Sequence, residues 1–243
     1  MTMAVAQWRL RAACDGWIAH LDSMPGWAYV YSMANAGRFI VIEGGEGAGK
    51  SRLLAALGER LLAGGREVVL TREPGGTPLG EQIRSLVLSE AAVGDHLAEL
   101  LLFDAARAHL TATVIRPALE RGAIVLCDRF AASSVAYQGY GRGLRRDVVE
   151  RANAIATGGL VPDLVLLLDL PVEAGLARRA GEGTANHFDR ETVAFHERVR
   201  TGFLELRTNR RTRGGSSMRR SRSIRCWMLR SRPSLRKTIH EEH

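Results

Sequence analysis

The sequence predicts a doubly wound α/β fold, in which helices cover both faces of a parallel sheet. Short, nearly continuous apolar runs alternate with longer segments of helical periodicity, and strands buried on both faces have this composition. The first apolar run leads directly into a glycine-rich motif, and a helical pattern follows that motif. The chain has 243 residues, which is enough for one such domain with additional segments at its ends.

The expected strands and helices alternate along the chain. Apolar runs expected to form strands lie at residues 38–43, 67–71, 123–127 and 164–168. After the glycine-rich motif, helical spacing of apolar residues is clearest at residues 79–88, 97–121, 145–156 and 191–207. Because helical segments separate the strands, we expect right-handed crossovers and a parallel sheet.

The glycine-rich motif Gly44–Ser51 matches the phosphate-binding pattern G-x-x-x-x-G-K-[ST] in full. Glycines let backbone N–H groups turn inward, and the next helix presents its positive dipole end to phosphate oxygens. Lys50 is expected to reach the β- and γ-phosphates, and the Ser51 hydroxyl to ligate Mg²⁺. The candidate nucleotide-binding residues are Gly44, Gly45, Glu46, Gly47, Ala48, Gly49, Lys50 and Ser51. The alternative is a glycine-rich turn before an ordinary helix, but the flanking strand and helix patterns favour a phosphate loop.

Composition excludes several other classes of protein. Three scattered cysteines indicate neither a disulfide framework nor a metal cluster, and they suit a reducing cytosol. Residues 1–36 hold no apolar run long enough for a membrane span or a secretory signal. The net charge of +8 comes largely from an arginine- and serine-rich segment after Arg207. That segment has no aromatic ladder or RNA-binding motif, so we expect a solvated tail and not a nucleic-acid-binding arm.

These observations divide the chain into three parts. Residues 1–36 are expected to be an extension outside the fold, with Met33 at the position of a natural start. Residues 37–207 are expected to form one domain, and residues 208–243 a basic tail that is disordered or aberrant in sequence.

A phosphate loop alone leaves kinases, GTPases and motor ATPases open. GTPases need a guanine-reading Asn/Thr-Lys-x-Asp motif after a strand, and the chain has none. Instead, Asp128 and Arg129 directly follow the third strand, at the sheet edge where open α/β sheets bind ligands. Asp128 is expected to hold Mg²⁺ directly or through water, and Arg129 to neutralise an acceptor phosphate. A surface salt bridge is the alternative reading of this pair.

Two residues of the long helix point to a base-binding site. Phe103 and Arg107 are four residues apart and share one helix face. A ring that stacks on a base and a guanidinium that hydrogen-bonds its carbonyl would therefore project together. If either residue faced the core, the alternative of another small-molecule phosphate-loop kinase would gain ground.

Several motifs occur in one order between Arg38 and about Leu206, and together they resemble bacterial thymidylate kinases. The motifs are Glu43–Ser51, Thr71–Thr77, Phe103–Arg107, Asp128–Phe130 and Ser133–Gly139. This resemblance implies the phosphate-loop kinase fold, with sheet order 2-3-1-4-5. It also implies transfer of phosphate from MgATP to dTMP, giving dTDP for dTTP synthesis.

The resemblance also implies a role for each of several residues. The substrate-binding residues that it implies are Glu46, Arg72, Phe103, Arg107, Arg129, Ser134, Tyr137 and Gln138. Phe103 would stack on thymine, while Arg107 and Ser134 or Gln138 would read its edge. Tyr137 would lie against the sugar and disfavour a 2′-hydroxyl.

Other residues would act on the phosphates. Glu46 would approach the nucleoside sugar, and Arg72 with Arg129 would hold the acceptor phosphate. The catalytic residues that the chain offers are Lys50, Asp128, Arg129 and Arg178. Because the phosphate of dTMP is already anionic near neutral pH, the reaction needs alignment and charge neutralisation more than a general base.

The chain departs from the family in two places. The lid, at about residues 177–190, carries Asn186-His187 where related lids usually have Asp-Arg, and Arg178, Arg179 and Arg190 remain as catalytic candidates. After Arg207 the arginine-rich segment stands where family members continue with a strand and a helix. We therefore expect the final edge strand of the sheet to be missing.

The sequence thus predicts a cytoplasmic dTMP kinase that uses ATP and Mg²⁺. The resemblance implies a homodimer, with dTMP and ATP as its small-molecule partners and no membrane association. The alternatives are another small-molecule phosphate-loop kinase, and a catalytically weak nucleotide-binding protein whose basic tail contacts a polyanion.

Overall fold

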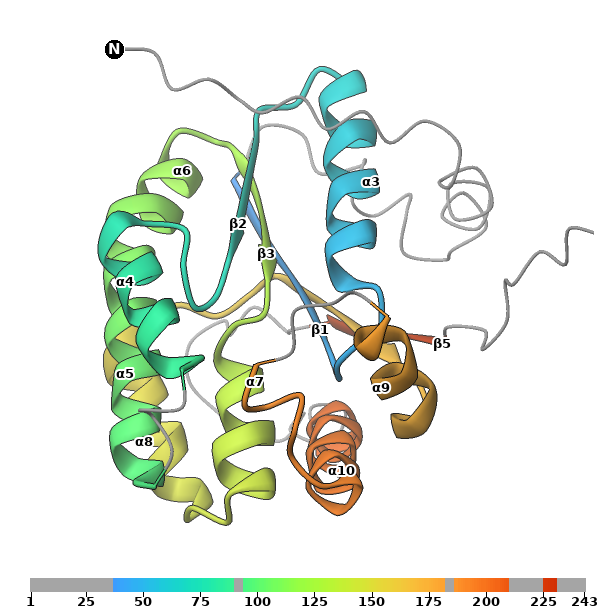
Figure 1. Ribbon diagram of the computed structural model, residues 1–243. Helices are drawn as coiled ribbons and strands as arrows, with labels where there is room; N and C mark the ends of the chain where they lie inside the picture. Colours follow the sequence, from blue (N-terminus) through green and yellow to red (C-terminus); the bar gives the residue numbers. More distant parts are fainter. Residues whose placement is uncertain (1–36, 90–93, 182–185, 210–224, 231–243) are drawn as a thin grey trace, which may run out of the picture.

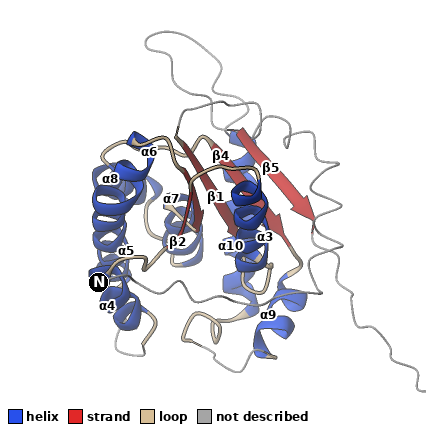
Figure 2. Ribbon diagram, turned by 90° about the horizontal axis from the view of Figure 1, so that it is seen from above, coloured by secondary structure: helices blue, strands red, loops and turns tan. Residues whose placement is uncertain are grey.

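The computed structural model describes residues 37–89, 94–181, 186–209 and 225–230. They contain one parallel sheet in the order β2-β3-β1-β4-β5, with helices on both sides (Figures 1 and 2). The strands are β1 (Arg38–Gly44), β2 (Val68–Arg72), β3 (Ile124–Asp128), β4 (Leu164–Asp169) and β5 (Arg225–Arg230). The doubly wound α/β prediction and its sheet order are confirmed.

The helices agree closely with the sequence patterns. They are α3 (Lys50–Ala63), α4 (Pro78–Val87), α5 (His96–Leu110), α6 (Arg116–Glu120), α7 (Ala131–Ser134), α8 (Arg146–Thr157), α9 (Val172–Ala180) and α10 (Val193–Asn209). Two π-helical segments, η2 (Thr111–Ile115) and η3 (Val135–Gly141), continue α5 and α7. The pattern predicted at residues 97–121 is therefore one continuous run of α5, η2 and α6.

Alternate residues of the strands face two separate parts of the core. In β1, Ile40 and Ile42 pack against leucines of α3 on one face of the sheet. Phe39 and Val41 face the other side, where residues of α5, η2 and α6 cover them. Helix α10 lies on this second side as well, because its Val199 packs with Leu167 of β4. Burial on both faces explains the continuous apolar composition of the strands.

The expectation that the final edge strand is missing was wrong. β5 pairs with β4 in parallel, in a register from Leu164 opposite Arg225 to Asp169 opposite Arg230. Pairing at a sheet edge needs an extended backbone with free hydrogen-bonding groups, so the surrounding arginines and serines do not prevent it. The predicted extension at residues 1–36 and the remainder of the predicted tail lie outside the described residues, apart from Thr208 and Asn209 at the end of α10.

The carboxyl ends of the central strands meet at one edge of the sheet. The phosphate loop follows β1, and the segment beginning with Arg129 follows β3, its neighbour in the sheet. β4 lies on the other side of β1 and ends at Asp169. The fold therefore brings residues from distant parts of the sequence to the edge where ligands of open α/β sheets bind.

Candidate active site

The phosphate loop bends tightly between β1 and α3, and two glycines make this path possible. Gly49 has φ 93° and forms the N-cap of α3, and Gly47 has φ 63°. A Cβ atom on Gly47 would lie 2.1 Å from the carbonyl oxygen of Gly175 in α9. The loop therefore packs tightly against the backbone of α9. No side chain caps the first N–H groups of α3, so these groups are available to bind a ligand.

Lys50 and Ser51 occupy the positions predicted for nucleotide and metal binding. Lys50 is buried, and its Nζ donates to Gly45 O at 2.8 Å, so its ammonium spans the loop. Burial and the nearby Arg129 lower the Lys50 pKa. The Ser51 hydroxyl donates to Asp128 Oδ2 at 2.9 Å across the sheet edge.

The oxygens of Ser51 and Asp128 fit a Mg²⁺ ion. Asp128 Oδ1 is buried and has no hydrogen-bond partner among the described residues. An oxygen of that kind beside a serine hydroxyl matches the preference of Mg²⁺ for a few protein oxygens plus phosphates and water. Within the described ranges no group of three or more acidic, histidine or cysteine side chains could hold a metal by itself, so the phosphates would supply further ligands.

Arg129, Glu46 and Tyr137 form a hydrogen-bonded triangle beside the loop. Arg129 Nη2 donates to Glu46 Oε1 at 2.8 Å and to Tyr137 Oη at 3.1 Å, and Tyr137 Oη donates to the same Glu46 oxygen at 2.7 Å. Burial would raise the pKa of Glu46, but the charges of Arg129 and Lys50 outweigh it and lower the pKa to about 2. The predicted sugar-side and phosphate-side residues therefore lie together.

Arg129 reaches this position through an unusual backbone conformation. Its φ is 71°, the one positive φ among described residues other than glycine. A strained residue of this kind persists when its surroundings fix it, and such residues cluster at functional sites. Glu43 supplies part of that support, because it is buried and accepts from Phe130 N at 3.0 Å and from Ser133 Oγ at 2.6 Å. Burial raises the pKa of Glu43.

Arg107 is fully buried in a polar cluster under the neighbouring part of the site. Its Nε donates to Glu73 Oε2 at 2.8 Å, and its Nη1 donates to Ser134 Oγ at 3.0 Å and to Asn153 Oδ1 at 2.6 Å. Asp104 accepts a further hydrogen bond from Nη1. Burial raises the pKa of Glu73.

Phe103 lies on the same helix and is partly buried among apolar residues. Its ring centroid is 6.1 Å from that of Phe188, which belongs to the predicted lid. Burial of Arg107 is the feature that would favour another small-molecule kinase, but its contact with Ser134 keeps it among the predicted base-reading residues.

Gln138 is another predicted base-reading residue, and a hydrogen bond to Glu99 of α5 holds its side-chain amide in place. Its Nε2 donates to Glu99 Oε1 at 2.9 Å, and both side chains are buried. Arg72 lies at the end of β2, where its Nη2 donates to both oxygens of Glu81 at 3.0 Å. Arg72 thus lies at the predicted edge of the sheet, but its exposed guanidinium is paired with the carboxylate of Glu81 in α4.

Arg178 places one cation of the lid region at the phosphate loop. Its Nη1 donates to Gly47 O at 3.5 Å. Arg179 instead pairs with Asp189 at 3.3 Å, which ties α9 to the last part of the predicted lid. Residues 182–185 of the predicted lid lie outside the described residues.

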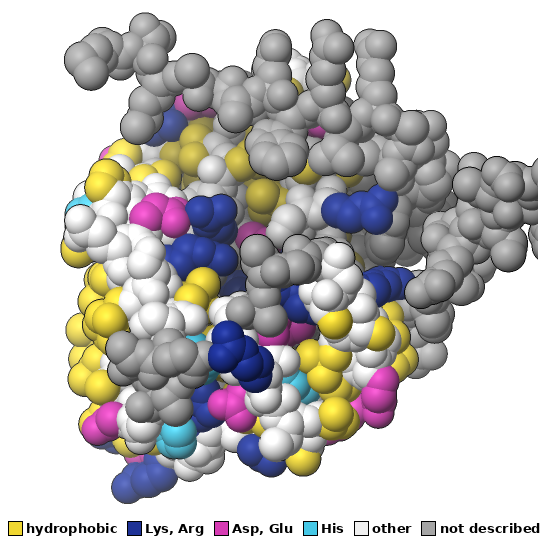
Figure 3. Space-filling model, viewed as in Figure 1, with side chains coloured by type: hydrophobic (Ala, Val, Ile, Leu, Met, Phe, Trp, Pro, Cys, Tyr) yellow, Lys and Arg dark blue, Asp and Glu magenta, His cyan; other side chains and the backbone are white. Residues whose placement is uncertain are grey.

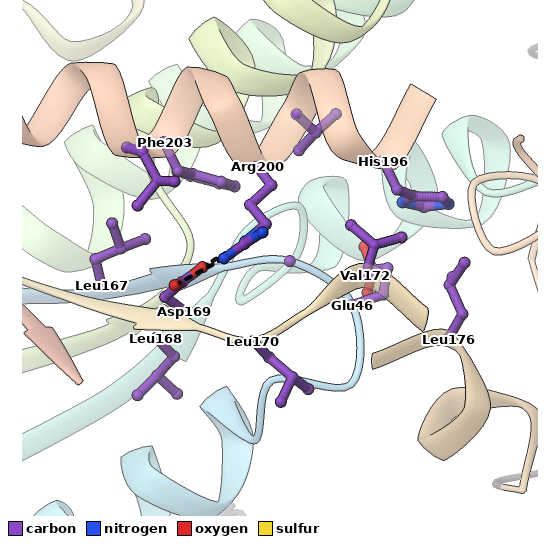
Figure 4. Close-up of a pocket in the computed structure, with 13 residues that line it drawn as sticks. Glu46, Leu167, Leu168, Asp169, Leu170, Val172, Leu176, His196, Arg200 and Phe203 are labelled. Carbon is purple, nitrogen blue, oxygen red and sulfur yellow. Dashed lines mark hydrogen bonds and ion pairs between the residues drawn. The ribbon is translucent and has the colours of Figure 1, made fainter. Parts of the chain in front are cut away.

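Basic side chains gather around a hollow in the face that contains these residues (Figure 3). A cavity of about 430 Å³, including its open mouth, adjoins the phosphate loop through Gly45 and Glu46. It lies between β4, α9 and α10, and the Arg200–Asp169 salt bridge, at 2.7 Å, crosses it (Figure 4). This cavity is mostly apolar and is separate from the Arg107 cluster.

Sequence reasoning missed the residues that hold the predicted ones in place. Glu73 lies within the motif Thr71–Thr77, but the motif does not indicate that Glu73 pairs with Arg107. Glu43 directly precedes the phosphate loop, and only its contact with Ser133 reveals that it supports Arg129. Asn153 and Glu99 carry no motif, and their partners are distant in the sequence, so nothing in the pattern could have identified them.

Comparisons with known proteins agree with this geometry. The family model described as thymidylate kinase matches residues 42–213. A thymidylate kinase of Thermosynechococcus vestitus is 53% identical over 182 residues, covering 70% of this chain and 76% of that protein. One from Deinococcus radiodurans is 52% identical over 170 residues, covering 70% and 82%. The crystal structure of thymidylate kinase from Ehrlichia chaffeensis has a TM-score of 0.63 and 32% identity, covering 80% of this chain and 93% of that one. None of the helices in the described part of the chain has the length and apolar character that crossing a membrane requires.

Proposed function

The chain belongs to the thymidylate kinase family and phosphorylates dTMP to dTDP, and from this premise we propose that MgATP is the phosphate donor and that the residues above have the following roles. The observation that carries the proposal is the position of the phosphate loop. Ser51 and Asp128 lie together on one side of it, and the Arg129–Glu46–Tyr137 triangle lies beside it. A donor phosphate and an acceptor phosphate would meet between these groups.

At the donor side, the loop N–H groups and Lys50 would hold the β- and γ-phosphates of ATP. Ser51 and Asp128 would hold Mg²⁺, which offsets phosphate charge and orients the transferring group when it is bound. Lys50 must then exchange its hydrogen bond to Gly45 O for one to a phosphate oxygen. Arg178 is the candidate lid cation, since it already contacts the loop at Gly47.

At the acceptor side, Arg129 would hold the phosphate of dTMP, with Arg72 as a second cation once it leaves Glu81. Glu46 stays ionised because its pKa is about 2. It would keep Arg129 and the Tyr137 hydroxyl in place and exclude a second anion from the sugar side. Tyr137 would pack against the deoxyribose and leave no room for a 2′-hydroxyl.

The base would lie over the Arg107 cluster. Phe103 would stack on thymine, and Arg107, Ser134 and Gln138 would read its edge. Each of these polar groups has a buried partner that fixes it, such as Glu73 for Arg107. Fixed donors of this kind discriminate bases strongly, because a mismatched base leaves buried groups unpaired.

A coupled ADP-release assay tests these roles. Purified protein would receive MgATP with dTMP, and dUMP, dCMP and dGMP would serve as rival acceptors. Turnover should be preferential for dTMP and lost in Lys50→Ala. Equal turnover of dCMP would contradict the base-pocket assignment, and activity in Lys50→Ala would contradict the loop assignment.

We also propose a homodimer through one flank of the molecule. Large apolar side chains are exposed on α4, α5 and α8, and hydrophobic residues cover this flank in Figure 3. They are Leu79, Leu86, Leu97, Leu101, Val148 and Ile155. An apolar patch of this kind on a soluble domain is typical of a subunit interface. A cytoplasmic location is proposed as well, and the buried free thiol of Cys127 suits it.

A further inference from the structure

The carboxylate of Glu99 joins the base pocket to the last part of the predicted lid, at His187. Glu99 is 3% exposed and lies in the first turns of α5. One oxygen, Oε1, accepts from Gln138 Nε2 at 2.9 Å. The other, Oε2, accepts from Arg142 Nη2 at 3.2 Å and lies 3.7 Å from His187 Nε2.

His187 is buried without a hydrogen bond. Its exposure is 6%, and neither ring nitrogen has a hydrogen-bond partner among the described residues. Buried polar atoms are nearly always hydrogen-bonded, so this ring is in an unusual position. Glu99 is the acceptor that faces it, and a movement of well under 1 Å would bring Nε2 within hydrogen-bond distance.

Arg142 ties the same carboxylate to the segment before α10. Its Nη2 donates to Glu99 Oε2 at 3.2 Å, and its Nη1 donates to Glu191. Gln138, Arg142 and His187 therefore all lie around the one buried carboxylate of Glu99. Removing that charge would leave buried donors without their acceptor, which is costly.

The same segment forms a wall beside the base-binding residues. The His187 ring lies 4.1 Å from the Phe188 ring, centroid to centroid. Phe188 in turn packs against Tyr137 at 5.8 Å and Phe103 at 6.1 Å. A contact between His187 and Glu99 would therefore hold this wall in place and fix the amide of Gln138.

We propose that Glu99 is a positioning residue for recognition of the thymine base, acting through Gln138, and that His187 completes its contacts. This proposal rests on the proposed role of Gln138 in base reading. Because the Glu99 carboxylate fixes the direction of the Gln138 amide, its loss weakens the preference for thymine over another pyrimidine as well as the affinity.

Thymidine binding measured by calorimetry tests the proposal, because thymidine carries no phosphate, and deoxycytidine serves as the rival ligand. Glu99→Gln should raise the thymidine dissociation constant about five- to tenfold, the size of one charge-assisted contact, and reduce the preference for thymidine over deoxycytidine. His187→Gln should change both values in the same direction. His109→Gln is the matched control, because His109 lies on α5, as Glu99 does, but contacts Thr77 instead; it should follow the wild type.

Circular dichroism confirms that each variant is folded. An unchanged thymidine affinity in Glu99→Gln, or an equal loss of thymidine and deoxycytidine affinity, would overturn the proposal. If wild-type protein bound deoxycytidine as tightly as thymidine, the base-pocket assignment itself would be wrong.

Discussion

Replacing Glu46 by glutamine should destabilise the protein in a pH-dependent way. The carboxylate accepts from Arg129 at 2.8 Å and from Tyr137 at 2.7 Å, and the side chains of Glu46 and Arg129 are 19% and 16% exposed. Glutamine keeps the shape and one acceptor oxygen but removes the charge. Arg129 would then be a buried cation without its counter-ion, which is costly.

The magnitude follows from the lowered pKa of Glu46. A fall from 4.5 to about 2 corresponds to about 3 kcal/mol of folding free energy at neutral pH. A lowered pKa stabilises the folded state above the unfolded value of 4.5, and this contribution is lost as the pH falls towards 2. At pH 3 only about 1 kcal/mol should remain. The variant should therefore lose about 2–3 kcal/mol at pH 7 and much less at pH 3.

Urea unfolding at pH 7 and pH 3, at one fixed protein concentration, measures both values. Glu150→Gln is the matched control, because its pair with Arg146 is on the surface, with side chains 47% and 41% exposed. That variant should lose no more than about 0.5 kcal/mol. If Glu46→Gln lost the same amount at both pH values, or no more than the control at pH 7, the charge of Glu46 would not be responsible.

Three further substitutions test other parts of the structure. Gly47→Ala should lose more than about 2 kcal/mol of stability in urea unfolding and most of its ATP affinity in titrations, because the new Cβ would lie 2.1 Å from a backbone oxygen of α9 at φ 63°. Asn153→Ala should raise the KM for dTMP about tenfold in steady-state assays with a smaller change in kcat, because Arg107 loses a 2.6 Å acceptor. Leu101→Glu on α5 should give monomers in analytical ultracentrifugation, whereas Leu62→Glu on α3, equally exposed at 54%, should not.

The parts of the site that depend on local sequence could be predicted. The phosphate loop is continuous in the sequence, and its glycines, Lys50 and Ser51 each have a role fixed by that order. Asp128 could be placed because it ends a buried strand, and parallel strands bring their carboxyl ends to one edge. These predictions needed no knowledge of tertiary contacts.

The supporting contacts could not be predicted in this way. Arg142 and Glu99 are 43 residues apart, and Glu43 and Ser133 are 90 apart, so their pairing depends on the finished packing of the helices. The positive φ of Arg129 likewise depends on surrounding contacts and has no signal in the residue itself. β5 has a weak signal in the sequence, because its short apolar run stands among arginines and serines and an edge strand needs only an extended backbone.

The charges beside the phosphate loop predict that the reaction depends strictly on Mg²⁺. Lys50 and Arg129 bring two positive charges, but Glu46, with a pKa of about 2, cancels one of them at every physiological pH. Lys50, Arg129 and Glu46 together therefore carry one net positive charge, and the charges of Arg178 and Asp128, which also lie at the loop, cancel each other. The dTMP phosphate and the transferring γ-phosphate together bring several negative charges to the same place. Because Arg129 also donates hydrogen bonds to Glu46 and Tyr137, it cannot neutralise both phosphates. A divalent ion held by Ser51 and Asp128 would supply the missing positive charge.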